Sequence, residues 1–343
     1  MELDIEDFAA LRDYLTEHRY VDLGETVAFK KLPGGVSNRT VRVSRAGGRG
    51  WVLKQALAKL RVQLDWFSSP ERIEVEAKAL RWLNHSAPRG TTPAFIFEDL
   101  ANHLMGMEAI PEENQNWKSA LLSGQIVSTY FEQFGLLLGT IHRRSSEDEA
   151  EVSRTFADTT YFESLRLQPY YIYTAQKTAA SARFLNALAQ ETLHHKHSLV
   201  HGDFSPKNTL IYQNQLILLD YEVVHFGDPA FDVGFALTHF LSKAHHLPRE
   251  RARLASAAAL FWQAYRKEIA GLNWAGAVEP RVARHTLGCL LARVAGKSPL
   301  EYLTAEEMAR QREIVLSLIV SPPTCVLDLI AVFVHHIETY AKN

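Results

Sequence analysis

The sequence predicts an α+β fold of two lobes, a small β-rich lobe over residues 1–110 and a larger, mainly helical lobe over residues 111–343. Apolar and polar residues alternate, as in strands, at several places in the first part. After Pro111, apolar residues recur mainly at helical spacing. The 343 residues, 47% of them hydrophobic, suffice for a large core and for one or two domains.

The elements of the first lobe follow from these periodicities. Helical spacing of apolar residues predicts helices within residues 3–19 and over residues 70–83, the second beginning with Pro70. Alternating or continuous apolar segments predict the strands. These strands are residues 40–43, 51–54, 95–98 and 104–108, with the glycines of 47–50 as the turn of a hairpin.

The second lobe is expected to be helical except for one hairpin. Helices are predicted at 126–142, within 160–197, and at 229–245, 250–270, 280–295 and 305–320. Thr209–Tyr212 and Leu216–Leu219 predict two short strands, because both are rich in apolar residues. Gln213-Asn214-Gln215 between them predicts a tight polar turn.

The most informative motif is His201-Gly202-Asp203-Phe204-Ser205-Pro206-Lys207-Asn208. It has the spacing His-x-Asp-x-x-x-x-Asn of a kinase catalytic loop. The transition state of phosphoryl transfer is loose, so positioning and charge neutralisation supply most of the catalysis. Asp203 is the candidate base beside the attacking hydroxyl, and Asn208 is a candidate ligand for Mg²⁺, which prefers oxygen donors.

Asp220 follows the predicted hairpin, twelve positions after Asn208. A hairpin brings the residues before its first strand and after its second to the same end, so Asn208 and Asp220 could share one Mg²⁺ ion. The alternative is that Asp203 and Asp220 are ordinary carboxylates at strand ends. Only seven residues separate Asp220 from Asp228, which leaves little room for the peptide-binding activation segment of a protein kinase.

The first lobe carries candidate nucleotide-binding residues. Lys54 ends a predicted strand and could reach the α- and β-phosphates, as a strand lysine does in kinases. Its partner is expected to be Glu76 on the next helix, with Glu74 as the second choice. The alternative for Lys54 is a solvated lysine on an edge strand.

Two backbone segments are further candidates. Gly34 and Gly35, followed by Ser37 and Asn38, could bring amides and small donors close to phosphate oxygens; the alternative is a plain Gly-Gly turn. Residues 105–110 could form a hinge in which backbone groups near Glu108 and Ile110 bind the base of the nucleotide.

Together these residues resemble the aminoglycoside phosphotransferase and choline kinase superfamily of small-molecule kinases. The resemblance runs from about residue 25 to residue 245 and ends with Gly227-Asp228-Pro229-Ala230-Phe231-Asp232. It implies a protein-kinase-like fold, with Asp203 as the base and with Asn208 and Asp220 as ligands of Mg²⁺. Asp232 would tether the catalytic loop.

One branch, methylthioribose kinase, is similar at further positions. They are Lys54-Gln55-Ala56-Leu57, Arg61, Glu71-Arg72, Glu76-Ala77 and Asp220-x-Glu222. This similarity implies that Glu222 also approaches the metal. Residues 204–208 differ from the loop of that branch, and Arg293 stands alone where two adjacent arginines are expected.

The sequence therefore predicts transfer of the γ-phosphoryl of ATP or GTP, with Mg²⁺, to a hydroxyl of a sugar, an amino alcohol or an aminoglycoside-like compound. The alternative is a non-catalytic, kinase-like module that binds nucleotide. Several C-terminal residues could wall the acceptor pocket or, alternatively, be core aromatics and surface arginines. They are Trp262, Tyr265, Arg281, Arg284, His285, Arg293 and Tyr302.

Composition limits the cellular compartment and the classes of partner that are expected. A formal net charge of −2 argues against a nucleic-acid binder, which usually has a basic surplus. The acidic start lacks the pattern of a signal peptide, and the apolar residues 316–334 are interrupted by Pro322-Pro323 and Asp328, so no membrane partner is expected. Two cysteines, Cys289 and Cys325, fit a reducing cytoplasm.

Overall fold

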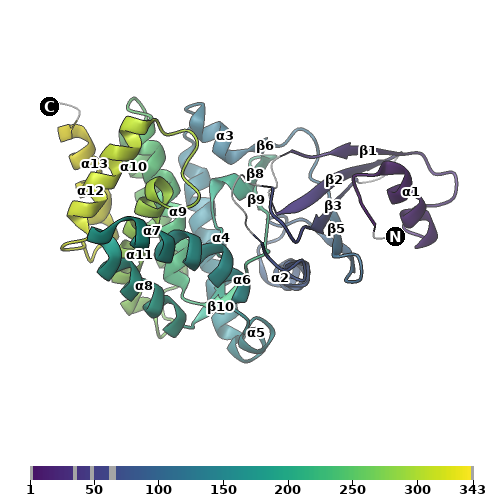
Figure 1. The fold of residues 1–343 in the computed structure, drawn as a ribbon, viewed down its shortest axis with the longest axis horizontal. Helices are drawn as coiled ribbons and strands as arrows, with labels where there is room; N and C mark the ends of the chain where they lie inside the picture. Colours follow the sequence, from purple (N-terminus) through teal and green to yellow (C-terminus); the bar gives the residue numbers. More distant parts are fainter. Residues whose placement is uncertain (1–2, 34–36, 47–49, 62–66, 341–343) are drawn as a thin grey trace. The chain divides into compact units, whose positions relative to one another are not determined.

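The computed structural model describes residues 3–33, 37–46, 50–61 and 67–340 (Figure 1). Contacts within the chain divide it into two compact units. The small unit is Met1–His85, Thr92–Asn114 and Leu219–Glu222, and the large unit is Ser86–Thr91, Gln115–Leu218 and Val223–Asn343. The two units are not continuous segments of the chain. Residues 86–91 belong to the large unit, and residues 219–222 belong to the small unit.

The small unit is built on an antiparallel sheet of five strands in the order β1-β2-β3-β5-β4 (Figure 1). Its elements are α1 Phe8–Glu17, β1 Val27–Lys31, β2 Asn38–Arg45, β3 Trp51–Ala56, α2 Arg72–Ser86, β4 Phe95–Asp99 and β5 Leu104–Glu108. The predicted helices and strands are confirmed, except that α2 begins at Arg72 rather than at Pro70. Of the turn predicted at 47–50, residues 47–49 lie outside the described residues. Strand β1 was not predicted, because it lies at the sheet edge and most of its side chains are exposed or half-buried, which removes the apolar alternation.

The core of the small unit lies between α1 and one face of the sheet. Val41 pairs with Leu53 across β2 and β3, and both side chains are fully buried together with Leu11 of α1. Successive strand residues point to opposite faces, so Lys54, next to Leu53, points away from this core. The sheet therefore presents Lys54 on the face opposite to α1, where it meets Glu76 of α2.

The large unit is mainly helical, as predicted (Figure 1). Its α-helices are α3 Trp117–Leu122, α4 Ser128–Glu147, α5 Glu149–Thr155, α6 Thr160–Phe162, α7 Tyr173–Lys177, α8 Ala182–His194, α9 Pro229–His246, α10 Arg251–Glu268, α11 Glu279–Ala295, α12 Ala305–Leu318 and α13 Val326–Tyr340. Its strands are β6 Gln115–Asn116, β7 Ser198–Val200, β8 Thr209–Tyr212, β9 Gln215–Leu218 and β10 His225–Gly227. A π-helix covers Glu163–Ile172.

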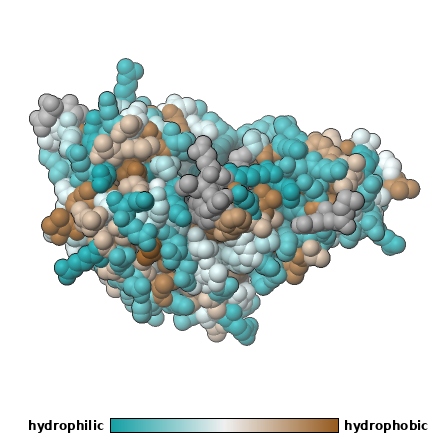
Figure 2. All heavy atoms as spheres, viewed as in Figure 1, coloured by the Kyte–Doolittle hydropathy of each residue, from teal (hydrophilic) through white to brown (hydrophobic). Residues whose placement is uncertain are grey.

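The expected helices and the hairpin β8-β9 are confirmed, whereas α3, α5, α13 and the π-helix were not predicted. Helix α13 begins after Pro322-Pro323, so the prolines precede a helix rather than interrupt one. None of the described helices combines the length and the apolar character that a bilayer crossing requires. The face of the molecule in Figure 2 is mostly hydrophilic, with apolar side chains in small separate groups.

Helix α9 forms the centre of the large unit, since every residue from Pro229 to His245 is buried. Neighbouring helices α4 and α10 approach each other closely where α4 has glycines. A Cβ atom on Gly135 would lie 2.3 Å from the carbonyl oxygen of Phe261, so any larger residue would push these two helices apart. Helices α4 and α9 both contact the motif of residues 201–208, α4 through Phe134 and α9 through Asp232.

Candidate active site

The loop that carries the catalytic motif is anchored by Asp232 in the first turn of α9. The buried Asp232 carboxylate accepts hydrogen bonds from the backbone N–H of His201 (2.6 Å) and of Gly202 (2.8 Å). His142 of α4 lies 3.4 Å from the same carboxylate and is itself bonded to the hydroxyl of Tyr265 (2.9 Å). Asp232, the residue expected to tether the loop, therefore does bind the loop backbone.

Two neighbours of Asp203 fix the course of the loop. Gly202 has φ +75°, and a Cβ atom there would lie 2.8 Å from Cγ2 of Val223, so both backbone and space favour glycine. Phe204 is fully buried and stacks on Phe134 of α4 with ring centroids 3.9 Å apart. Since these residues flank Asp203 on both sides, they define the direction of its side chain.

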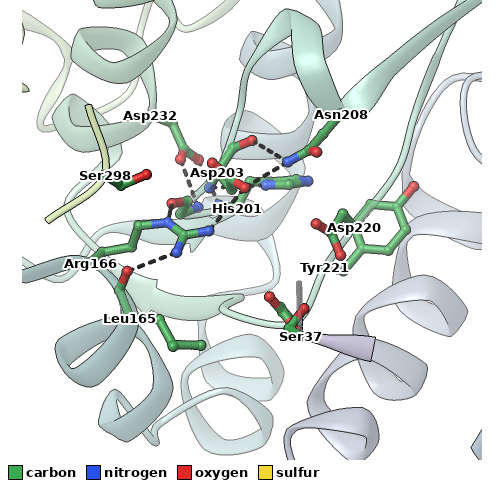
Figure 3. Close-up of polar contacts among 12 residues, drawn as sticks. Ser37, Leu165, Arg166, His201, Asp203, Asn208, Asp220, Tyr221, Asp232 and Ser298 are labelled. Carbon is green, nitrogen blue, oxygen red and sulfur yellow. Dashed lines mark hydrogen bonds and ion pairs between the residues drawn. The ribbon is translucent and has the colours of Figure 1, made fainter. Parts of the chain in front are cut away.

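The Asp203 carboxylate is held by two side chains of the large unit (Figure 3). Asn208 donates from Nδ2 to Asp203 Oδ2 (2.7 Å) and to the Asp203 carbonyl oxygen (3.1 Å). Arg166 places NH2 2.9 Å from the same Oδ2. Because the amide nitrogen of Asn208 faces Asp203, its carbonyl oxygen Oδ1 is the atom that suits a metal ion.

Arg166 is the site residue that sequence reasoning missed. It lies on the π-helix Glu163–Ile172, and its Nε also donates to the carbonyl oxygen of Gly202 (2.8 Å). π-Helical turns occur often at functional sites. Two signals could have pointed to it, namely Pro169 inside a predicted helix and Ser205 at the loop position where protein kinases usually have lysine.

The predicted hairpin that follows Asn208 is present. Thr209 pairs with Leu218, so Asn208 and Leu219 adjoin the last residue pair at one end of the β8-β9 ladder. Gln213 and Asn214 form the turn with φ of 49° and 60°, which is typical of a two-residue type I′ hairpin turn. The predicted turn was one residue too long, because Gln215 belongs to β9.

In the small unit, Lys54 is paired with two carboxylates. Its Nζ lies 2.5 Å from Oε1 of Glu76 and 2.7 Å from Oδ1 of Asp220. Glu76 is fully buried, whereas the second choice, Glu74, pairs with Lys78 on the surface of α2. The structure thus brings Lys54 together with Glu76 and Asp220 and leaves Glu74 elsewhere.

Asp220 has an unusual backbone conformation. Its φ of +70° is in the left-handed region, which is uncommon for residues other than glycine and costs free energy. The next N–H, that of Tyr221, donates to Oε1 of Glu76 (3.3 Å) and so helps to hold this conformation. Such strained residues cluster at functional sites.

Glu222 is held by residues near the start of β2. Arg72, fully buried, donates from Nε to Oε2 of Glu222 (3.1 Å) and from NH2 to the carbonyl oxygen of Ser37. Asn38 donates from Nδ2 to the same Oε2 (3.4 Å). Glu222, Ser37 and Asn38 therefore form one network, while Gly34 and Gly35 lie outside the described residues.

This cluster contains groups of both charges. Three carboxylates, Glu76, Asp220 and Glu222, are linked to two cations, Lys54 and Arg72. Burial raises the pKa of Glu76 to about 7 against the effect of Lys54. Burial alone would lower the pKa of Lys54, but the three carboxylates raise it. Carboxylate oxygens are the donors that a divalent cation such as Mg²⁺ prefers. Among the described residues, however, no group of three or more His, Cys, Asp or Glu side chains is arranged to hold a metal ion.

The predicted hinge residues have backbone partners within the small unit. The N–H of Glu108 donates to Ala94 (2.8 Å), and the carbonyl oxygen of Ile110 accepts from Arg42 (2.9 Å). These two groups serve the fold, and binding of the base by this segment stays a prediction.

The candidate acceptor residues separate into two groups. Arg281 binds the N-cap carboxylate of Asp228 (2.9 Å), and Trp262 is a core residue with 1% of its surface exposed. These two residues therefore support the fold. Arg293, by contrast, belongs to a group of basic side chains beside the catalytic loop.

Comparison with solved structures shows the same fold in several enzymes. Amicoumacin kinase hAmiN, solved with AMP-PNP, Ca²⁺ and Ami, has a TM-score of 0.60 at 15% identity, over 94% of this chain and 96% of that chain. Macrolide 2′-phosphotransferase MphH from Brachybacterium faecium has a TM-score of 0.53 at 18% identity, over 92% of this chain and 98% of that chain. Aminoglycoside phosphotransferase APH(2″)-Ib, bound to ADP, has a TM-score of 0.51 at 14% identity, over 94% of this chain and 99% of that chain.

A comparison with curated proteins gave no significant match. The family model of the phosphotransferase enzyme family, APH, matches residues 28–274, which include both the small-unit cluster and the catalytic loop. This agrees with the resemblance that the motifs indicated, and with the predicted α+β fold of two lobes. The chain belongs to the phosphotransferase enzyme family.

Proposed function

We propose that the protein transfers the γ-phosphoryl group of ATP or GTP, with Mg²⁺, to a hydroxyl group of a small molecule. The observation that carries this proposal is the arrangement around Asp203, a carboxylate positioned by Asn208 and Arg166 on a loop whose backbone is bound by Asp232. A base for a hydroxyl must be held in one orientation before the substrate arrives, and this set of contacts does so.

Asp203 accepts the hydroxyl proton, or orients the hydroxyl, as the oxygen attacks the γ-phosphorus. The bond from the γ-phosphorus to the bridging oxygen breaks, and ADP or GDP leaves. Arg166 keeps a positive charge beside this carboxylate and bonds the adjacent backbone at Gly202, so it is a positioning residue. Lys54, held by Glu76, binds the α- and β-phosphates, which stabilises the nucleotide rather than the hydroxyl.

Asn208 and Asp220 would hold Mg²⁺, with Glu222 as the third candidate. Bound Mg²⁺ would offset the charge of the phosphate oxygens. Support comes from the oxygen donors that Asp220 and Glu222 supply and from the orientation of the Asn208 amide. The amicoumacin kinase structure contains AMP-PNP with Ca²⁺, which also favours a nucleotide and a divalent cation for this fold.

The test is a screen for phosphorylated product by mass spectrometry. The purified protein is incubated with Mg²⁺, ATP or GTP, and a panel of sugars, hydroxy acids, amino alcohols and aminoglycosides. Asp203→Asn serves as the matched control. Product formed by the native protein and not by the variant supports the proposal. Nucleotide binding without transfer to any acceptor or to water would instead favour the non-catalytic module.

A further inference from the structure

Five basic side chains gather on the large unit around the catalytic loop. They are Lys118 of α3, Lys207 of the loop, His239 and Lys243 of α9, and Arg293 of α11, and we call them the basic cluster. Lys243 donates from Nζ to the carbonyl oxygen of His239 (3.2 Å), and Arg293 places NH2 3.3 Å from Nε2 of His239.

Aromatic rings fix the longer members of the basic cluster. Arg293 lies over the rings of Tyr170 and Phe235, 5.1 and 5.5 Å from their centroids. Lys243 and Lys118 both lie over the ring of Tyr302, at 5.3 and 5.9 Å. Cation–π contacts of this kind hold a positive charge in place without neutralising it.

The basic cluster lacks matching negative charge. Glu301, an exposed carboxylate, pairs with Lys118, whereas no carboxylate in the described part of the chain lies within ion-pair distance of Lys243 or Arg293. Lys243 is fully buried, and burial together with Lys118 and Arg293 lowers its pKa to about 7. Burial and the neighbouring cations hold the pKa of His239 well below its ordinary value, so His239 adds no charge near neutral pH. Buried charges are normally paired, so the unpaired Arg293 and Lys243 indicate a missing anion.

Two buried polar atoms in the same place also lack partners. Arg293 Nε and the hydroxyl of Tyr302 make no hydrogen bond in the structure. Arg293 is 8% exposed, so its donor is both desolvated and unpaired. An unpaired buried donor costs free energy that an acceptor oxygen would recover.

The basic cluster is joined to the residues that would perform the reaction. Asn116 donates from Nδ2 to the carbonyl oxygen of Lys207 (2.8 Å), which links the start of α3 to the loop just before Asn208. Lys207 is exposed and Lys118 is partly exposed, whereas Lys243 and Arg293 are buried.

We infer that the acceptor carries an anionic group, a carboxylate or a phosphate, which the basic cluster binds while Asp203 meets the hydroxyl. This inference rests on the proposed phosphotransferase function and narrows its substrate. A polycationic acceptor such as an aminoglycoside is disfavoured here, because several fixed positive charges would repel it.

Three matched probes test the sign of the charge. Gluconate, sorbitol and glucamine share a six-carbon polyol chain and differ at one end, which is a carboxylate, a hydroxymethyl group or an ammonium group. Each is titrated calorimetrically into the protein saturated with AMP-PNP and Mg²⁺. We expect gluconate to bind at least ~10-fold more tightly than sorbitol, and glucamine to bind least. Equal binding, absence of gluconate binding, or a preference for glucamine would overturn the inference.

Charge variants test whether the basic cluster is responsible. Lys118→Gln should weaken gluconate binding by roughly three- to tenfold, and Glu301→Gln should strengthen it by a similar factor. Both positions reach the surface, so the fold should tolerate these changes. Lys243→Met removes a basic side chain at a buried position of the same cluster. Lys78→Gln, on α2 in the small unit, is the matched control. Unchanged gluconate affinity in both Lys118→Gln and Glu301→Gln would also overturn the inference.

The same samples separate this inference from the proposed function. Failure of AMP-PNP to bind with Mg²⁺ would contradict the phosphotransferase proposal itself. Normal nucleotide binding, followed by phosphorylation of neutral or cationic acceptors in preference to anionic ones, would contradict only the acceptor inference.

Discussion

Asp203 and Asp220, the two aspartates that the motifs single out, have opposite surroundings. In the large unit, Asp203 is bound by Arg166 and Asn208, and basic side chains gather around its loop. In the small unit, Asp220 is bound by Lys54, and two further carboxylates, Glu76 and Glu222, belong to the same network. The surroundings of Asp203 are therefore mainly basic, whereas those of Asp220 are rich in carboxylates.

This difference separates two tasks. A base must be oriented in the absence of ligand, and Asp203 is held by hydrogen bonds and an ion pair from its own unit. A metal site needs oxygen donors, and the proposed site around Asp220 combines carboxylates with a strained φ and a buried Glu76. Variants at the two aspartates and their neighbours can show whether these two tasks are separable.

The largest expected effect is on turnover in Asp203→Asn. Loss of the base should lower kcat by roughly 100- to 10,000-fold. Nucleotide affinity should change little, because the nucleotide-binding candidates Lys54 and Glu76 lie in the other unit. Steady-state kinetics and calorimetric titration with AMP-PNP measure the two quantities. Unchanged kcat would contradict the assignment of the base.

Arg166→Met should have the next largest effect on turnover. The variant keeps the length of the side chain but loses the ion pair to Asp203 Oδ2 and the bond to Gly202. We expect kcat to fall by roughly 10- to 100-fold with an unchanged nucleotide Kd, since a misoriented base loses part of its effect.

A conservative replacement distinguishes positioning from a general role in folding. Arg166→Lys should recover part of kcat, because it restores a cation beside Asp203. Equal loss in both variants, with normal thermal stability, would mean that the positive charge does not matter.

Asp232→Asn tests the anchor of the catalytic loop. The fully buried carboxylate receives two backbone N–H groups, and the amide would present an N–H group to one of them. The free energy of unfolding should fall by about 2–3 kcal/mol, measured by urea denaturation. Asp328→Asn, at an exposed position of α13, is the control and should change it by less than about 0.5 kcal/mol. Equal stability of the two variants would remove Asp232 as an anchor.

The smallest expected effect is a pH dependence that originates in Glu76. Its pKa is raised from 4.5 to about 7 by burial, so the folded state binds the proton more tightly than the unfolded state. The stability that this proton contributes is complete below pH 4.5 and is lost as the pH rises through about 7. In buffer without divalent cations, the free energy of unfolding should decline over this range in the native protein and decline less in Glu76→Gln. Parallel pH profiles would contradict the account.

The sequence revealed those parts of the site that are local in the chain. The catalytic loop, the hairpin after Asn208 and the strand that ends near Lys54 follow from spacing and periodicity within a few residues. Arg166 could not be found this way, because it reaches Asp203 from a π-helix 37 positions earlier and has no fixed spacing to the motif.

Glu222 illustrates the same limit. The similarity to methylthioribose kinase at Asp220-x-Glu222 implied that both carboxylates approach the metal. In the structure the partner of Glu222 is Arg72, which lies 150 positions away in the sequence. Arg72 is buried in the small unit, and no local sequence pattern indicates this burial. Similarly, Lys243 and Arg293 come from different helices, so their common excess of positive charge emerges only when α9 and α11 pack together.

The most direct test measures magnesium-dependent nucleotide affinity and phosphoryl transfer together in two isosteric variants, Asp203→Asn and Asp220→Asn. The account predicts that Asp203→Asn binds AMP-PNP with Mg²⁺ like the native protein but transfers almost no phosphoryl group. It predicts that Asp220→Asn loses both, with affinity reduced at least ~10-fold in Mg²⁺ and unchanged in EDTA. Native affinity in Asp220→Asn, or native transfer in Asp203→Asn, would contradict it.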